Sequence, residues 1–253
     1  RLGVTLFVRH TKGLTLTAEG RQVLAIIRPL LAQQDETYDA LSRLAQAGTS
    51  SLRIGLTTAF EQGVFATLET VLAAQVETLH VVRHGSPELV RQVRRGKLDA
   101  ALVALPLETS GLNLMPLSRQ EPLIAALPEQ WPESKQDRLM LRALNDRPLF
   151  WFKRERNPAF FDFTRDIFRR VGYLPACIEE PLEHDVLLAR IARGEGLSLF
   201  PESFAAIQRQ GVIFRPIDEA ALYVQCGLVT SPENAARLDW LVNMVQADSR
   251  GTS

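Results

Sequence analysis

Apolar residues follow three different patterns along this chain. Residues 4–7 form a short apolar segment, residues 10–13 read as a turn containing glycine, and residues 14–17 alternate as a half-buried strand does. We expect a small hairpin there. Residues 18–49 then carry apolar positions at helical spacing, and from residue 52 onward short apolar runs alternate with amphipathic stretches. This last pattern predicts an α/β domain built on a parallel sheet.

The long helical stretch follows a residue suited to capping it. Thr17 is a favourable N-cap, and Glu19 places a negative charge at the positive end of the helix dipole. Apolar residues then recur three and four positions apart, so that they form a seam along one face of the helix. We expect this seam to pair two chains through Leu24, Ile27, Leu31, Tyr38 and Leu41. The seam is narrow and the helix is long, which favours dimerisation; packing on the helix's own domain is the alternative. Pro29 is expected to bend the helix.

The α/β region reads as two lobes. The first has strands at 52–56, 79–83 and 98–104, with helices at 64–74 and from Ser86 to Gly96. The second has a short helix and turn at 141–148, strands at 149–152 and 177–178, a helix capped by Asn157, and a helix at 185–193 that leads through residues 194–201 into a further strand. Its core aromatics include Phe161 and Phe163. Residues 222–230 return as a strand to the first lobe. The predicted units are a wing at 1–17, a linker helix at 18–49, lobe I at 50–120, lobe II at 121–221 and the return to lobe I at 222–253.

Composition narrows the functional classes. Basic and acidic residues balance at 29 each, without the positive charge typical of a stand-alone nucleic-acid binder. Cys177 and Cys226 are too few for a disulfide scaffold and fit a reducing compartment; a redox-sensing pair is the alternative. No apolar run approaches the roughly 18 residues of a membrane span. No signal peptide opens the sequence, so we expect a cytoplasmic protein.

No arrangement of residues indicates catalysis. The four histidines (His10, His80, His84 and His184) lack metal-ligand spacing, and there is no G-x-S-x-G elbow, Gly-rich phosphate loop or C-x-x-C. Asp99, at the start of a predicted strand, is expected to be structural. We therefore expect neither an enzyme nor a metal or cofactor.

Three phrases of the sequence resemble one protein family. They are L-G-V-x-L-F-x-R-x-x-x-G-x-x-L-T-x-x-G at residues 2–20, G-S-P-E-L-V-R-Q-V-R-R-G-K-L-D-A-A-L at 85–102 and G-E-G-L-S-L-F-P at 194–201. They resemble the DNA-binding wing and the effector domain of LysR-type transcriptional regulators. The resemblance implies a two-lobed, periplasmic-binding-protein-like (type 2) effector domain, preceded by a linker helix and the wing of a winged helix-turn-helix. The main DNA-reading helix is then expected upstream of Arg1, so that the sequence is N-terminally truncated.

The same resemblance implies partners. The wing residues Arg9, Thr11 and Lys12 would contact operator or promoter DNA, and the protein would act as a homodimer or homotetramer. A periplasmic solute-binding protein shares the two-lobed fold and is the alternative. The wing, the linker helix and the missing signal peptide count against it.

Polar residues near predicted strand ends indicate a ligand site. Ligands of open α/β sheets bind beyond the carboxyl ends of strands, close to helix N-termini. Such positions are Thr57, Thr58 and Ser86 in lobe I, and Lys153, His184 and Pro201 in lobe II. Facing each other, the two lobes would form a cleft of hydroxyls, helix N-termini and a cation, which suits a small carboxylate.

The sequence looks closest to the LysR-type subgroup that controls aromatic-compound catabolism. Its effectors are aromatic acids or muconate-like products, and the resemblance implies that Thr58 and Ser86 bind the effector carboxylate. Ala104 stands where some members carry arginine. Our hypothesis is that Lys153 and His184 supply the missing positive charge; a His184 without a ligand is the alternative.

Overall fold

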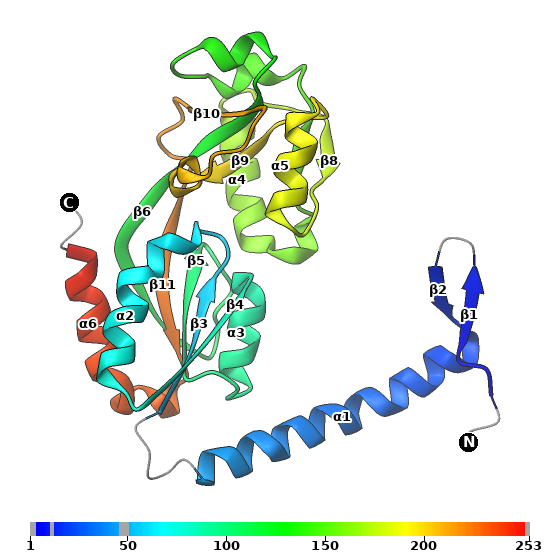
Figure 1. Ribbon diagram of the computed structural model, residues 1–253, viewed down its shortest axis with the longest axis vertical. Coiled ribbons are helices and arrows are strands. Elements are labelled where there is room, and N and C mark those ends of the chain that lie inside the picture. Colours follow the sequence, from blue (N-terminus) through cyan, green and yellow to red (C-terminus); the bar gives the residue numbers. More distant parts are fainter. Residues whose placement is uncertain (1–3, 11–12, 46–50, 251–253) are drawn as a thin grey trace. The chain divides into compact units, whose positions relative to one another are not determined.

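The structure, a computed structural model, describes residues 4–10, 13–45 and 51–250 (Figure 1). The chain separates into two compact units, Arg1–Ser50 and Ser51–Ser253. None of the helices described is long and apolar enough to cross a membrane.

The first unit is a hairpin followed by a long helix. Strand β1 (Phe7–His10) pairs antiparallel with β2 (Gly13–Leu16), and Phe7 lies opposite Leu16. The hairpin is as predicted, except that β1 begins at the end of the apolar segment rather than at residue 4. Helix α1 (Ala18–Ala45) starts directly after β2.

The junction between hairpin and helix explains two residues of the sequence pattern. The Thr17 hydroxyl accepts a hydrogen bond from the Gly20 N–H at 2.8 Å and donates to the Thr5 carbonyl at 2.7 Å. Thr17 is thus the predicted N-cap, and it also ties the helix to the segment before β1. A Cβ atom at Gly20 would lie 2.1 Å from the Leu6 carbonyl oxygen, so only glycine fits there.

Helix α1 carries apolar side chains in solvent. Of the predicted seam, Leu24 is half-buried, whereas Ile27 and Leu31 are 38% and 52% exposed. The neighbouring Ile26 and Leu30 are exposed as well, so this apolar surface is wider than the predicted seam. The side chains of Tyr38 and Leu41 lie outside the described part of the chain, as do Thr11 and Lys12. The helix continues through Pro29.

The second unit is built on a seven-stranded sheet that both lobes share. In lobe I, β3 (Ser51–Thr57) is parallel to β4 (Thr78–His84) and β5 (Ala100–Leu105), and β11 (Tyr223–Thr230) is antiparallel to β5. The 16-residue strand β6 (Asn113–Pro128) pairs first with β11, then with β9 (Ser198–Pro201) and β10 (Val212–Pro216) of lobe II. Figure 1 shows β6 running from one lobe to the other, and this confirms the two-lobed α/β fold.

Helices complete the two lobes. Lobe I contains α2 (Ala66–Gln75), α3 (Ser86–Arg94) and α6 (Asp239–Arg250). Lobe II contains α4 (Pro158–Arg170), α5 (His184–Ala192) and a parallel pair of short strands, β7 (Leu149–Trp151) and β8 (Cys177–Glu179). Single 3₁₀ turns are formed by Gln62–Phe65, Pro132–Lys135, Leu141–Leu144, Arg154–Arg156, Glu202–Ala206, Pro232–Asn234 and Ala236–Leu238.

Asp99 has the structural role expected of it. Its carboxylate accepts hydrogen bonds from the Arg53 backbone N–H at 2.8 Å and from the Arg53 guanidinium. It also forms a 2.7 Å ion pair with Arg237, which precedes α6. Asp99 is buried, so these contacts compensate the loss of water around its charge and join β3, the start of β5 and the C-terminal segment.

Candidate functional site

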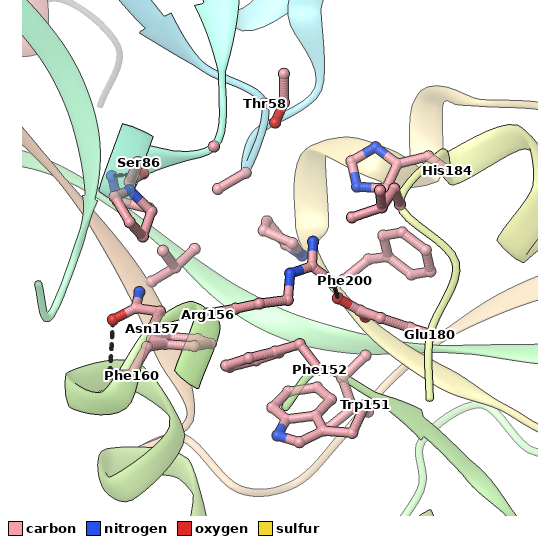
Figure 2. A pocket seen from close by; sticks show the side chains of 18 of the residues that line it. Thr58, Ser86, Trp151, Phe152, Arg156, Asn157, Phe160, Glu180, His184 and Phe200 are labelled. Atoms are coloured by element: carbon pink, nitrogen blue, oxygen red, sulfur yellow. Dashed lines mark hydrogen bonds and ion pairs between the residues drawn. The ribbon is translucent and has the colours of Figure 1, made fainter. Parts of the chain in front are cut away.

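A cavity of about 610 Å³ lies between the two lobes of the second unit (Figure 2). Five of the seven residues predicted to bind an effector line it: Thr58, Ser86, Ala104, His184 and Pro201. Figure 2 shows Thr58 and Ser86 on one side of the pocket and Glu180, His184 and Phe200 on the opposite side. The other two predicted residues, Thr57 and Lys153, are not in its wall.

Thr57 is fully buried behind the lobe I wall and holds Ser86 in place. The hydroxyl oxygens of Thr57 and Ser86 are 2.7 Å apart, and the Ser86 oxygen accepts the Ala104 N–H at 2.9 Å. The Thr57 oxygen also accepts the Ala59 N–H at 3.2 Å.

The burial of Thr57 decides which hydroxyl is the donor. If Ser86 donated to Thr57, the Thr57 proton would be a buried donor without an acceptor, which costs about 1–3 kcal/mol. Thr57 therefore donates to Ser86, and the Ser86 proton remains for an acceptor in the pocket. The Thr58 hydroxyl, whose residue is half-buried, makes no hydrogen bond with the described residues. Two hydroxyl donors thus face the cavity from lobe I.

Lobe II supplies a charged pair that the sequence did not indicate. Arg156, at the end of a 3₁₀ turn, donates a 3.0 Å hydrogen bond from Nη1 to Oε1 of Glu180, and both residues line the pocket. Burial raises the pKa of Glu180 to about 7, although the Arg156 guanidinium opposes this shift. Near neutral pH, Glu180 is therefore partly protonated.

His184 lies edge-on against two aromatic rings of lobe II. Its ring centroid is 5.7 Å from that of Phe200 and 4.9 Å from that of Phe204. Burial lowers the pKa of the imidazole, the Arg156 charge acts in the same direction, and Asp185 opposes them. His184 is consequently uncharged at neutral pH.

Lys153 does not reach the pocket. Its side chain is 63% exposed and forms a 2.8 Å ion pair with Glu179. The backbone turns after β7, so that Arg156 rather than Lys153 points into the cavity. The structure thus gives no support to the hypothesis that Lys153 and His184 supply the pocket's charge. Arg156 and Arg91 are the arginines of the lining.

Aromatic rings form a third wall. Trp151 from β7 and Phe152 lie with centroids 5.1 Å apart, and Phe160 of α4 stacks on Phe152 at 6.0 Å. These rings line the cavity, whereas Phe161 and Phe163 of the same cluster pack against the core as expected. The pocket therefore combines a flat apolar wall with hydroxyl donors on one lobe and an ion pair on the other (Figure 2).

The pocket is not positively charged overall. Its lining contains three carboxylates, of Glu88, Glu155 and Glu180, and two guanidiniums, of Arg91 and Arg156. Arg91 is paired with Glu88 at 2.5 Å, and hydrogen bonds from Gln92 and Arg91 hold the pKa of Glu88 below its usual range. Both arginines are thus already paired with carboxylates. Among the residues that the structure describes, no group of His, Cys, Asp and Glu could hold a metal ion.

Of the predicted DNA contacts, only Arg9 lies in the described part of the chain. It is exposed on β1, opposite Leu14. An exposed basic side chain beside a hairpin turn is free to approach a phosphate.

Comparison with known proteins agrees with these features. Residues 45–250 match the family model of the LysR substrate binding domain. The HTH-type transcriptional regulator IlvR of Caulobacter vibrioides is 28% identical over 98% of this chain and 84% of its own length.

Two solved structures share the fold. CbnR, a LysR family transcriptional regulator, superposes with a TM-score of 0.65 and 21% identity over 91% of this chain and 82% of its own. The effector binding domain of QuiR in complex with shikimate has a TM-score of 0.65 and 16% identity over 81% of this chain and 99% of its own. IlvR and CbnR are transcriptional regulators rather than enzymes or periplasmic solute-binding proteins. The chain belongs to the LysR family of transcriptional regulators, and its second unit carries the family's substrate-binding domain.

Proposed function

We propose that the second unit senses a small carboxylate in the interlobe pocket and that this binding alters how the regulator grips its promoter DNA. One observation carries the proposal: the Thr58 and Ser86 hydroxyls both face a partly apolar cavity between two lobes. A carboxylate accepts hydrogen bonds through both oxygens, so it can satisfy both donors at once.

The rest of the pocket suits the body of such a ligand. Trp151, Phe152 and Phe160 offer flat apolar surfaces on which a ring or a conjugated chain can stack. Aromatic acids and muconate-like diacids have this combination of a flat body and a carboxylate. The complex of QuiR with shikimate supports the choice, because shikimate is itself a small cyclic carboxylate.

The connection between the lobes offers a route from ligand to DNA. The lobes are joined by β6 and by the segment that leads into β11, and a ligand bridging both lobes favours one relative arrangement. The exposed apolar stripe on α1, with Ile27 and Leu31, is proposed to pair two chains, together with Leu24, Tyr38 and Leu41. The oligomer would then present Arg9, Thr11 and Lys12 of each wing to the phosphates of two half-sites.

Thermal shift measurements with a panel of aromatic acids and muconates test the sensor. We expect at least one of them to raise the melting temperature of the wild type. Thr58→Ala and Ser86→Ala should each lower the affinity for that ligand tenfold or more, because a hydrogen bond to a charged group contributes about 1.5–3 kcal/mol. Thr70→Ala, which removes an exposed hydroxyl of α2 outside the pocket, is the matched control.

The two variants differ in their structural cost. Ser86→Ala also leaves the Thr57 hydroxyl without its partner, whereas the Thr58 hydroxyl bonds to no described residue. Ligand-induced shifts are therefore compared with each variant's own unliganded melting temperature. An unchanged response in Thr58→Ala would contradict the proposed site.

A further inference from the structure

The lobe II wall holds a carboxylate oxygen that no described residue satisfies. Oε1 of Glu180 is taken by Arg156, but Oε2 accepts no hydrogen bond from the described residues. The Glu180 side chain is only 19% exposed, and it lines the cavity opposite Thr58 and Ser86 (Figure 2). An acceptor in the wall of a ligand pocket that has no partner in the protein can receive a hydrogen bond from a bound ligand.

The charges around Glu180 make that donor a cationic one. The other charged and titratable residues of the lining are Arg156 and Glu155 on the 3₁₀ turn, His184 at the start of α5, and the Glu88–Arg91 pair on lobe I, and Asp185 acts on His184. His184 is neutral and both arginines are paired, so this environment supplies no free positive charge. An effector with a carboxylate alone would bring a further negative charge into a partly desolvated pocket that already holds Glu155 and Glu180.

We propose that the effector is a zwitterion: its carboxylate binds the Thr58 and Ser86 hydroxyls, and a protonated amine donates to the free oxygen of Glu180. Its apolar or aromatic body lies against Trp151, Phe152 and Phe160. This inference rests on the proposed carboxylate seat in lobe I and adds a second recognition point in lobe II. An ammonium group supplies the positive charge that the pocket lacks and leaves the Arg156–Glu180 pair intact.

Matched probes separate the two recognition points. L-phenylalanine, 3-phenylpropanoate and 2-phenylethylamine share a skeleton. The first carries both charged groups, the second only the carboxylate and the third only the amine. L-leucine, 4-methylpentanoate and 3-methylbutylamine form the aliphatic counterpart. In calorimetric titrations at pH 7 we expect one of the amino acids to bind at least tenfold more tightly than its matched acid and its matched amine.

Glu180→Gln should remove this advantage. The amino acid is expected to bind at least tenfold more weakly to Glu180→Gln than to the wild type, while the matched acid binds as well or better. Glu179→Gln is the control, because Glu179 is the neighbouring carboxylate but is 62% exposed and outside the pocket. It should leave both affinities unchanged.

Proton release gives an independent readout. Because the pKa of Glu180 is about 7, the group is about half protonated at pH 7, and an adjacent ammonium lowers that pKa. Binding of the amino acid should therefore release about half a proton per site, measured as the difference between titrations in phosphate and Tris buffers. A carboxylate alone would instead cause proton uptake, and Glu180→Gln should abolish both effects.

The outcomes distinguish the inference from the proposed function. If the acids bind as tightly as the amino acids, with proton uptake, the inference of a zwitterion is wrong. The proposed carboxylate site in lobe I is then still supported, provided that Thr58→Ala lowers the affinity for the acids. If an amino acid binds but Thr58→Ala and Ser86→Ala leave its affinity unchanged, both proposals are wrong. If none of the six probes binds, the inference of a zwitterion is wrong.

Discussion

Replacing Glu180 by glutamine should change the way in which stability depends on pH. Burial raises the pKa of Glu180 from an ordinary value of 4.5 to about 7. The folded protein therefore holds this proton more tightly than the unfolded chain does. The stability that belongs to the protonated carboxyl is fully present below pH 4.5 and is lost as the pH rises towards 7. A pKa shift of this size changes the free energy of unfolding by about 3 kcal/mol, because one pKa unit corresponds to about 1.4 kcal/mol.

Urea denaturation of the wild type and of Glu180→Gln at intervals from pH 4.5 to 8 measures this effect. We expect the free energy of unfolding of the variant, relative to the wild type, to increase by about 3 kcal/mol across that range. Glu179→Gln, at an exposed neighbouring carboxylate, should run parallel to the wild type. Parallel curves for Glu180→Gln and the wild type would refute the argument that the pocket desolvates Glu180.

Three further substitutions test the hydroxyl network, the apolar surface of α1 and the junction between hairpin and helix. Thr57→Val keeps the side-chain shape but leaves the Ala59 N–H unpaired. It should lower the free energy of unfolding by about 1–3 kcal/mol in urea titrations. A change below about 0.5 kcal/mol would contradict the proposed hydrogen bonds of the Thr57 hydroxyl. Leu31→Glu should weaken self-association at least tenfold in sedimentation velocity, and an unchanged oligomer would exclude this stripe as the interface. Gly20→Ala, which places a Cβ 2.1 Å from the Leu6 carbonyl, should reduce hydrogen-exchange protection at the start of α1; unchanged protection would contradict the tight junction.

Much of the fold follows from local sequence signals. Thr17 is predicted as a cap because its hydroxyl can reach the helix N–H groups, and the structure has that hydrogen bond. Helix α3 has Pro87 near its start and Gly96 at positive φ after its end, and both residue types are common at these positions. Such features depend on neighbouring residues alone and are therefore visible in a sequence.

Two strands were missed because their pairing is not local. The first half of β6 (Asn113–Pro128) is mostly exposed and contains Pro116, so its composition resembles a loop. It becomes a strand through its pairing with β11, about a hundred residues later in the chain. Strand β10 (Val212–Pro216) also lies between polar segments and pairs with the far end of β6. The helix expected at residues 141–148 is a 3₁₀ turn, Leu141–Leu144.

The lobe I side of the pocket was easier to predict than the lobe II side. Thr58 and Ser86 follow the ends of β3 and β4, where the geometry of parallel sheets places ligands. In lobe II, the 3₁₀ turn decides which side chain enters the cavity, and it selects Arg156 instead of Lys153. The properties of Glu180 arise from burial by distant segments, for which the sequence around it offers no signal.

The most direct test of the carboxylate site is a crystal structure of the complex with the tightest-binding carboxylate of the panel. We expect a ligand between the lobes, with its carboxylate oxygens about 2.6–3.2 Å from the Ser86 and Thr58 hydroxyl oxygens. A ligand bound outside this pocket, or one whose carboxylate pairs with Arg156 and leaves both hydroxyls without a partner, would contradict this expectation.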